Sequence, residues 1–319
     1  MKTNISLILI LCLLLGACKN GNASSQNKSE TSQDTIKAIK MPAIPQMMTA
    51  PEQRADFLAK HYWDNVNFAD TNYIHHPEVT EQAWADYCDL LNHVPLETAQ
   101  QAMRNVIDRT NVDKKVFTYI TDLADKYLYD PNSPMRNEEF YIPVLEAMIA
   151  SPVLNETEKI RPQARLKLAQ KNRIGTKALN FTYTLASGAQ GSLYQLKAEY
   201  LLLFINNPGC QACTETIEGL KNAPIINQLL QEKKLVLLSI YPDEELDEWK
   251  KHLSEFPNEW INGYDKKFTI KEEQVYDLKA IPTLYLLDKD KTVLLKDATA
   301  PAIEAYVLPW IWLTTISIN

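Results

Sequence analysis

Cysteine is scarce in this sequence, and basic residues form no cluster. Five Cys occur among 319 residues, and a net charge of -7 is spread along the chain. So few cysteines exclude a small fold stapled by disulfide bonds. Because binding to a phosphate backbone needs concentrated Lys and Arg, the charge distribution speaks against nucleic acid as a partner.

The apolar runs at the two ends of the chain are too short to span a bilayer. At the N-terminus, residues 5–15 follow a lysine and precede Gly16-Ala17-Cys18, a pattern that predicts a signal peptide over residues 1–17. This ending resembles the lipobox of bacterial lipoproteins, in which the cysteine is acylated and becomes the new N-terminus. The resemblance implies a lipid anchor on Cys18. The alternative is an ordinary secretory signal that is cut elsewhere, with Cys18 as an incidental thiol.

Residues 18–48 are rich in Ser, Asn, Gln, Thr and Lys and have few large apolar side chains. Such a segment cannot bury enough surface to offset the loss of chain entropy on folding, so it is predicted to be a flexible tether. The remaining chain is long enough for two modest domains, which we assign to residues 49–172 and 173–308. Residues 309–319 form an apolar tail with no assigned role.

The first of these domains carries a helical pattern. Pro51 suits the first turn of a helix, and Pro143 is expected to strain or kink a later one. The clearest set of apolar side chains at helix spacing is Leu96, Ala99, Met103 and Val106. No internal repeat is sharp enough to identify a solenoid. This half is predicted to be a separate all-α domain of unknown function.

The pattern of the second domain alternates between strands and helices. In order, we predict a strand at 200–205, a helix at 223–231, a strand at 235–241, a helix at 243–253, a hairpin of strands 281–287 and 293–295, and a closing helix at 300–307. The β-α-β order at its start implies a parallel strand pair.

Two cysteines stand one helical turn apart after the first predicted strand. They are Cys210 and Cys213, and further along the chain Ile281-Pro282 opens another apolar run. Disulfides are exchanged by thiolate attack on sulfur, so one Cys of such a pair can attack a partner while the other resolves the mixed disulfide. Half of a zinc site is the alternative, but neither a second Cys pair nor a neighbouring His is present. The pair is therefore interpreted as redox-active.

Cys88, His75 and His76 are weaker candidates for a functional role. Cys88 shares a helical stripe with Trp84 and Leu91, where a thiol usually behaves as a small buried hydrophobe. His75 and His76 are adjacent, and adjacent side chains seldom converge on one metal ion. We therefore expect no metal and no cofactor.

Residues 201–213 together with 280–288 resemble thioredoxin-fold proteins, most closely the TlpA-type thiol-disulfide oxidoreductases of the cell envelope. The resemblance implies an α/β thioredoxin fold over residues 173–308, with a central mixed sheet and flanking helices. The helical half resembles an uncharacterised domain found ahead of such modules in Gram-negative envelope lipoproteins. That second likeness carries no known activity.

The resemblance also assigns roles to individual residues. Cys210 is the nucleophile, at a helix N-terminus where free amide groups favour the thiolate. Cys213 resolves the mixed disulfide by attacking Cys210, so that the two form the redox disulfide. Pro282 is cis and faces the two sulfurs. The residues expected to contact substrate are Ile281, Gly209 and Gln211.

Two positions depart from the family pattern. Gly209 stands where a Trp often precedes the first Cys, so the rim of the site is smaller. Phe204 stands six residues before that Cys, where thioredoxins place a buried acid that relays protons to the second Cys. Glu215 and Glu218 lie nearby in the sequence but are equally consistent with solvated surface charges. Resolution is therefore expected to be slow or assisted by solvent.

Together these features predict a lipid-anchored thiol-disulfide oxidoreductase of the cell envelope that faces the periplasm. Lys19 after Cys18 favours the outer over the inner membrane. The expected partners are exported proteins with cysteines, an envelope electron donor and the membrane that holds the anchor. Family likeness favours reduction or isomerisation of disulfides over their formation. The rival hypothesis is a redox-silent thioredoxin-fold lipoprotein for binding or assembly, whose helical domain grips a partner.

Overall fold

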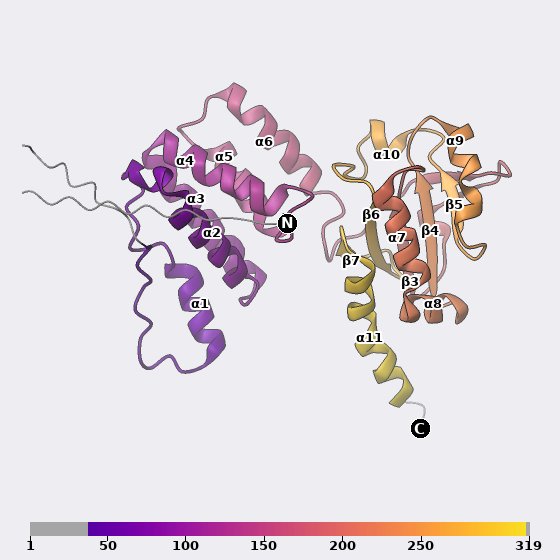
Figure 1. Cartoon of the computed structure of the whole chain (residues 1–319), viewed down its shortest axis with the longest axis horizontal. Helices are drawn as coiled ribbons and strands as arrows, with labels where there is room; N and C mark the ends of the chain where they lie inside the picture. The colour runs from indigo at the N-terminus through magenta and orange to yellow at the C-terminus, as the bar shows by residue number, and fades with distance from the viewer. Residues whose placement is uncertain (1–37, 317–319) are drawn as a thin grey trace, which may run out of the picture. The chain divides into compact units, whose positions relative to one another are not determined.

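The structure is a computed structural model that describes residues 38–316, with side chains for residues 38–308 (Figure 1). The predicted signal peptide and Cys18 lie outside the described residues. Of the predicted tether, residues 38–48 are described and form no helix or strand. Ile39 is nevertheless half-buried against the helices that follow, and Asn65 Nδ2 donates to the Lys40 carbonyl at 2.9 Å. This end of the segment therefore packs on the helical half of the chain.

Residues 51–169 form an all-α half, as predicted. Its helices are α1 (Pro51–His61), α2 (Pro77–Leu91), α3 (Leu96–Arg109), α4 (Lys114–Ala124), α5 (Glu138–Ala150) and α6 (Glu156–Ala169). Short 3-10 turns lie at Thr71–His75 and Thr110–Val112, and a π turn lies at Asp125–Tyr129. Apolar side chains at helix spacing turn inward and form one core, whose largest buried members include Trp84, Tyr87, Met103 and Phe117.

Pro143 lies inside α5 without ending it. A proline in a helix interior leaves the carbonyl four residues earlier without its usual N–H donor. In α5 that carbonyl belongs to Glu139, and Gln100 Nε2 of α3 donates to it at 3.1 Å. A neighbouring helix thus replaces the lost hydrogen bond, and the proline position becomes a polar contact between α3 and α5.

The second half of the chain builds one mixed sheet. Its strands are β1 (Thr182–Leu185), β2 (Gln190–Ser192), β3 (Tyr200–Ile205), β4 (Leu235–Tyr241), β5 (Ile261–Tyr264), β6 (Thr283–Asp288) and β7 (Val293–Lys296). Their order across the sheet is β2-β1-β5-β4-β3-β6-β7. β3, β4 and β5 run parallel, while the pairs on either side are antiparallel. The predicted parallel pair of residues 200–205 and 235–241 is therefore confirmed.

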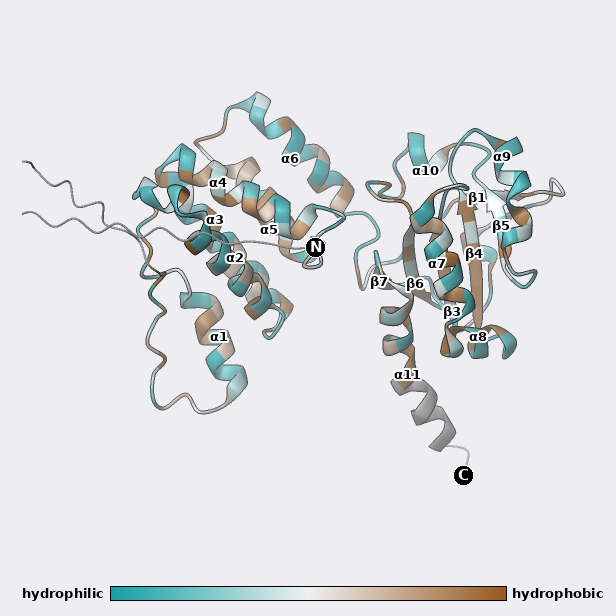
Figure 2. Ribbon diagram, in the orientation of Figure 1, coloured by the Kyte–Doolittle hydropathy of each residue, from teal (hydrophilic) through white to brown (hydrophobic). Residues whose placement is uncertain are grey.

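Helices cover both faces of this sheet. Leu202 and Phe204 of β3 face a core that includes side chains of α7 (Gln211–Lys221), α8 (Pro224–Gln231) and α11 (Ala300–Ile316). The alternate residues of β3 face a second core, to which α10 (Thr269–Glu272) and Tyr276 contribute. The short helix α9 (Leu246–Lys251) follows β4. Strands buried on both faces are apolar throughout, and β4 stands out as hydrophobic in Figure 2.

Of the elements that differ from the prediction, two have a clear physical explanation. The sequence pattern misses β5, because its Gly263 is typical of turns. Glycine suits this position, since a Cβ would be crowded 3.0 Å from Tyr183 Cδ2 and 3.3 Å from the Thr184 carbonyl oxygen of β1. The predicted closing helix is too short, because α11 continues to Ile316 through most of the predicted apolar tail. Pro309 removes one backbone donor there without ending the helix.

The helical half and the sheet half belong to one compact unit. Each half has an apolar core of its own, and charged side chains connect the two. Within residues 38–316, no helix has both the length and the apolar character needed to cross a membrane.

Replacing Gly263 with Ala is expected to lower the free energy of unfolding by about 1–3 kcal/mol, because the added methyl group displaces Tyr183 or the β1–β5 pairing. Gly219, in α7 with open space around it, is the matched control. Gly219→Ala should raise the free energy of unfolding by up to about 1 kcal/mol through helix propensity. Denaturant unfolding measures the free energy of unfolding of both variants. Equal changes in Gly263→Ala and Gly219→Ala would contradict the close packing of Tyr183 on β5.

Candidate functional site

Cys210 lies at the N-terminus of α7, in the turn that follows β3. It is the N-cap residue of the helix, and its carbonyl accepts the Thr214 N–H at 3.0 Å. Gly209, just before it, has a φ of 74°, a left-handed conformation that residues with a side chain rarely adopt. A Trp at this position would be strained, whereas glycine lets the chain turn sharply into the helix.

Strand pairing brings Cys210 to its predicted partners. β3 and β6 are antiparallel with Ile205 opposite Thr283, so the end of β3 meets the start of β6. The Ile281–Pro282 peptide bond, just before β6, is cis, as the resemblance implies. The Cys210 thiol is partly exposed and donates to the Ile281 carbonyl oxygen at 3.8 Å. Residues from two distant parts of the sequence therefore meet at one sulfur.

Cys213 lies further along α7 and is only 2% exposed. The Asn207 backbone N–H donates to its Sγ at 3.5 Å. Burial raises the pKa of the Cys213 thiol to about 12; the Asn207 N–H opposes this shift, and the neighbouring Cys210 adds to it. Cys213 is therefore protonated at neutral pH, which suits a resolving cysteine better than an attacking one.

Phe204 occupies the position where thioredoxins have a buried acid. It is fully buried on β3, and its ring meets that of Trp260 edge to face, with the centroids 6.4 Å apart. An unpaired carboxylate in this apolar core would be costly to bury. Glu215 accepts from Gln211 Nε2 at 2.9 Å, Glu218 pairs with a lysine of the same helix, and both glutamates are exposed. Their contacts are those of surface charges.

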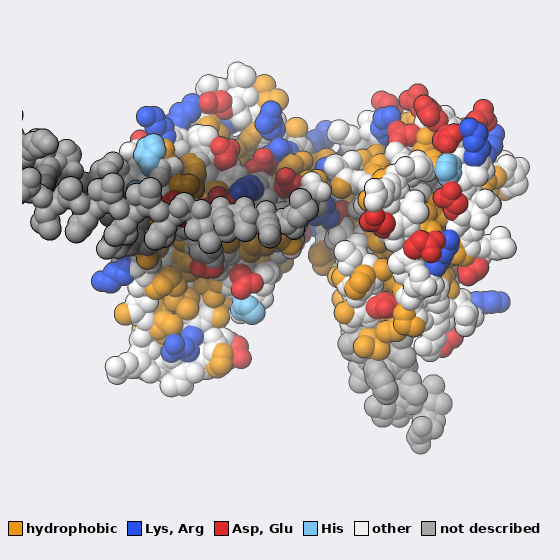
Figure 3. All heavy atoms as spheres, in the orientation of Figure 1, with side chains coloured by type: hydrophobic (Ala, Val, Ile, Leu, Met, Phe, Trp, Pro, Cys, Tyr) orange, Lys and Arg blue, Asp and Glu red, His pale blue; other side chains and the backbone are white. Residues whose placement is uncertain are grey.

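A polar chain beside the cysteines was not predicted. Asn207 Nδ2 donates to Asp243 Oδ2 at 3.1 Å, and Asp243 Oδ1 pairs with Lys271 Nζ at 2.8 Å. These residues line an open groove of about 350 Å³ together with Tyr241 and Glu248, and acidic side chains gather over α9 and α10 in Figure 3. Asn207 and Asp243 each follow one strand of the parallel pair, which is the sequence signal that places them at one edge of the sheet.

The remaining sequence candidates belong to the helical half. Cys88 is buried in its core, and burial raises the pKa of this thiol far above the ordinary value. His75 ends a 3-10 turn, and His76 Nδ1 lies 3.1 Å from Glu78 Oε1. Across the part of the chain that the structure describes, no group of three or more His, Cys, Asp or Glu is arranged to hold a metal ion.

Two family profiles match the chain. One, described as thioredoxin-like, matches residues 198–293, which include both cysteines of the pair and Pro282. The other, described as a domain of unknown function (DUF5106), matches residues 17–172. A comparison with curated proteins finds no match.

The chain is similar to three solved structures from Bacteroides. A thioredoxin-like protein from Bacteroides caccae shares 83% identity, with a TM-score of 0.84 over 86% of this chain and 99% of that one. The C-terminal domain of an uncharacterized protein from Bacteroides fragilis shares 69% identity, with a TM-score of 0.43 over 43% of this chain and 98% of its own. The thioredoxin domain of a thiol-disulfide oxidoreductase from Bacteroides vulgatus shares 20% identity, with a TM-score of 0.39 over 43% of this chain and 97% of its own. The first similarity and the thioredoxin-like profile confirm the predicted fold class and the family resemblance.

The buried thiol of Cys213 predicts a pH dependence for the resolving step. Only the thiolate attacks the mixed disulfide, so below its pKa the rate should rise about tenfold per pH unit. Since that pKa is about 12, we expect no plateau up to about pH 9. Stopped-flow measurement on a mixed disulfide formed at Cys210 checks this. A plateau near neutral pH would mean that a group of the protein accepts the proton.

Proposed function

This chain belongs to the thioredoxin-like protein family, and we propose that it is a thiol-disulfide oxidoreductase that reduces or isomerises disulfides of exported proteins. Its fold is related to that of thiol-disulfide oxidoreductases. The observation that carries the proposal is the setting of Cys210. It is a partly exposed thiol at a helix N-terminus, 3.8 Å from the Ile281 carbonyl oxygen, with a second thiol one turn away.

The N-terminus of α7 favours an anion at the Cys210 sulfur. The first amide groups of a helix lack partners within the helix, and the helix dipole adds partial positive charge. Cys210 is itself the N-cap residue, its side chain makes no hydrogen bond to these amide groups, and the first turn of α7 contains no acidic residue. The amide groups are therefore open to the negative charge that an attacking sulfur carries.

The proposed reaction consists of two exchanges. The Cys210 thiolate attacks one sulfur of a substrate disulfide, forms a mixed disulfide and releases the other substrate sulfur as a thiolate. Cys213 then gives its proton to solvent and attacks Cys210 Sγ, which releases the second substrate sulfur and leaves the two cysteines joined as a disulfide. The substrate gains two electrons and the enzyme loses two. A dithiol electron donor of the envelope restores the reduced pair.

The proposed substrate contacts surround Cys210. The Ile281 carbonyl, which faces the reactive sulfur, is placed to accept an N–H from an extended substrate segment. Gly209 and Gln211 flank Cys210 and are exposed, so they form the rim that a substrate meets first. Because Cys213 is buried and protonated, the mixed disulfide persists long enough to rearrange, which supports isomerisation as well as reduction.

A lipid anchor on Cys18 is part of the proposal and is supported by the Gly16-Ala17-Cys18 ending alone. It would attach the enzyme to the envelope on the periplasmic side, and Lys19 favours the outer membrane. An anchor of two or three acyl chains gives durable attachment, unlike a single chain. Substrates would then be exported proteins that carry cysteines.

A redox-silent role in binding or assembly is the second candidate function, and Phe204 is the observation that favours it. With an aromatic ring in place of an acid, Cys213 has no carboxylate beneath it to take its proton. The two functions predict different behaviour of a Cys210–Cys213 disulfide. A bridge that dithiol reductants open readily supports the enzyme, and one that resists them supports the scaffold.

Replacing each cysteine of the pair tests the proposed enzyme. Cys210→Ser should reduce the rate of insulin disulfide reduction by at least about a thousandfold, because the attacking sulfur is lost. Cys213→Ser should instead accumulate mixed disulfides at Cys210, visible by non-reducing electrophoresis and mass spectrometry. Glu218→Gln, which changes a surface charge paired with Lys221 on the same helix, is the control and should leave turnover unchanged. Full activity of both cysteine variants would exclude the mechanism.

A further inference from the structure

We propose that Glu138, at the start of α5, is a positioning residue of the redox site. It ties residues 273–282, a loop that ends in Ile281 and Pro282, to the helical half of the chain. The inference rests on the proposed function, because this loop presents the carbonyl that faces Cys210. Through Glu138, the helical half takes part in positioning the loop that faces Cys210.

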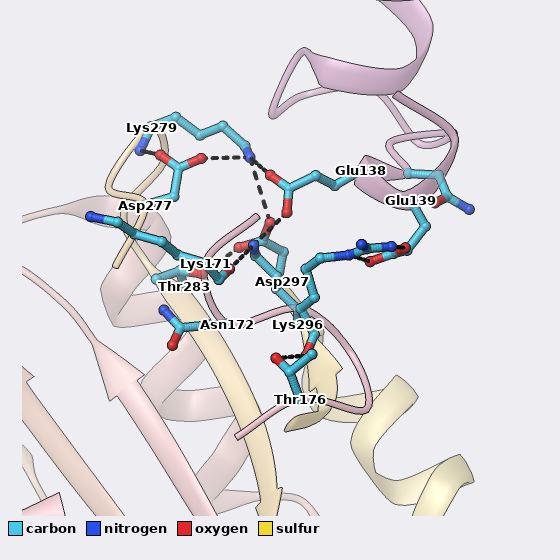
Figure 4. A network of polar contacts seen from close by, with 12 residues as sticks. Glu138, Glu139, Lys171, Asn172, Thr176, Asp277, Lys279, Thr283, Lys296 and Asp297 are labelled. Atoms are coloured by element: carbon cyan, nitrogen blue, oxygen red, sulfur yellow. Dashed lines mark hydrogen bonds and ion pairs between the residues drawn. The ribbon is translucent and has the colours of Figure 1, made fainter. Parts of the chain in front are cut away.

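Glu138 binds two lysines that come from the sheet half (Figure 4). One carboxylate oxygen pairs with Lys279 Nζ at 3.2 Å, and the other pairs with Lys296 Nζ at the end of β7. The side chains of Glu138, Lys279 and Lys296 are only 10%, 11% and 6% exposed. Ion pairs buried to this degree are little screened, and removing one partner leaves an uncompensated charge.

Lys279 is also held by carboxylates on its own side. Its Nζ lies 2.8 Å from Asp277 Oδ2 and 3.8 Å from Asp297 Oδ2. Burial alone would lower the pKa of the Lys279 ammonium, but Glu138, Asp297 and Asp277 outweigh it and raise the pKa above its ordinary value. Lys279 therefore stays charged and links the loop to three carboxylates.

Asp297 extends the same cluster to the other side of Pro282. Its Oδ1 accepts the hydroxyl of Thr283, the first residue of β6, at 2.7 Å. Its Oδ2 lies 3.4 Å from Arg136 Nη2, which belongs to the helical half. The cluster is balanced in charge, since its acidic and basic members are Glu138, Asp277 and Asp297 on one side and Lys279, Lys296 and Arg136 on the other. Both flanks of the Ile281–Pro282 bond are thus fixed by one set of contacts.

The start of the loop is held by the segment that follows α6. Lys171 Nζ donates to the carbonyl oxygens of Glu273 and Gln274 at 3.1 and 2.7 Å. Asn172 Nδ2 donates to the Val275 carbonyl at 2.7 Å. The loop belongs to no helix or strand, so these side-chain hydrogen bonds help to fix the course of its backbone.

Hydrogen exchange on the full chain tests the positioning directly. Glu138→Gln keeps the side-chain shape but removes the charge shared by two buried ammonium groups, so amides of residues 273–283 should exchange at least about tenfold faster than in the unsubstituted protein. Glu139→Gln is the matched control, because Glu139 is the next residue of α5 and binds Arg173 and Gln100 instead of the loop. In that variant the exchange of residues 273–283 should not change. Equal exchange in all three proteins would overturn the inference, and this readout needs no redox activity.

Kinetics test the consequence for the reaction. In Glu138→Gln the KM for a protein disulfide should rise about tenfold, while the rate with hydroxyethyl disulfide, which needs only the sulfur, should stay within about twofold. Glu139→Gln should change neither value. The positioning role would be overturned if Glu138→Gln lost as much activity with hydroxyethyl disulfide as with the protein disulfide. It would also be overturned if Glu139→Gln lost as much activity as Glu138→Gln. A protein that reduces neither disulfide before substitution would defeat the proposed function instead, and hydrogen exchange would then decide the inference alone.

A double substitution separates positioning from a loss of folding. Lys279→Gln combined with Glu138→Gln removes both charges of the pair and restores the charge balance of the cluster. If Glu138→Gln unfolds too readily for exchange measurements, the double variant should recover part of the lost stability, because the buried charges balance again and Lys296 keeps the Lys171 carbonyl as an acceptor. Its effects on loop exchange should be smaller than the sum of the two single effects. Strictly additive effects would show that the two residues act independently and would overturn the inference.

Discussion

The antiparallel pairing of β3 with β6 decides where the proposed redox site forms. Cys210 follows one strand and Pro282 precedes the other, so the two meet only because Ile205 lies opposite Thr283. Both strands are buried on both faces, and a shift of one residue would exchange their side chains between the two cores. Burial of apolar side chains therefore fixes the register, and the register fixes the distance between the Cys210 sulfur and the loop that faces it.

The same helix gives its two cysteines opposite chemical properties. Cys210 is partly exposed at the helix tip, while Cys213 lies in the core with one backbone N–H as a hydrogen-bond donor. Phe204 strengthens this contrast, because its packing on Trp260 stabilises the core where an acid would speed proton transfer. In the proposed reaction, a core that is favourable for stability would slow the attack of Cys213, and a slow attack would leave time for a bound substrate to rearrange.

Much of this architecture follows from the sequence, because β3 and β4 are apolar except for Ser239 and the cysteine pair follows the first of them. β5 could not be predicted in the same way, since Gly263 weakens the strand pattern and is explained only by the Tyr183 ring that packs on it. Asn207 and Asp243 carry a weak positional signal. The cluster around Glu138 carries no such signal. From the sequence pattern its charged residues look like solvated surface, and the lysine partners of Glu138 lie 141 and 158 residues further along the chain.

Burying a charged cluster between two parts of a protein carries a large desolvation cost. The location of this cluster suggests that it contributes geometry more than stability. Apolar contacts stabilise a junction but tolerate sliding, whereas buried ion pairs and their hydrogen bonds demand particular directions and often add little net stability. Here the directional contacts lie on both sides of the Ile281–Pro282 bond and on the loop that leads to it. A loop that belongs to no helix or strand needs such outside contacts to keep one backbone conformation. Because Glu138 and Arg136 supply part of them, the geometry at Cys210 depends on the helical half as well as on the sheet.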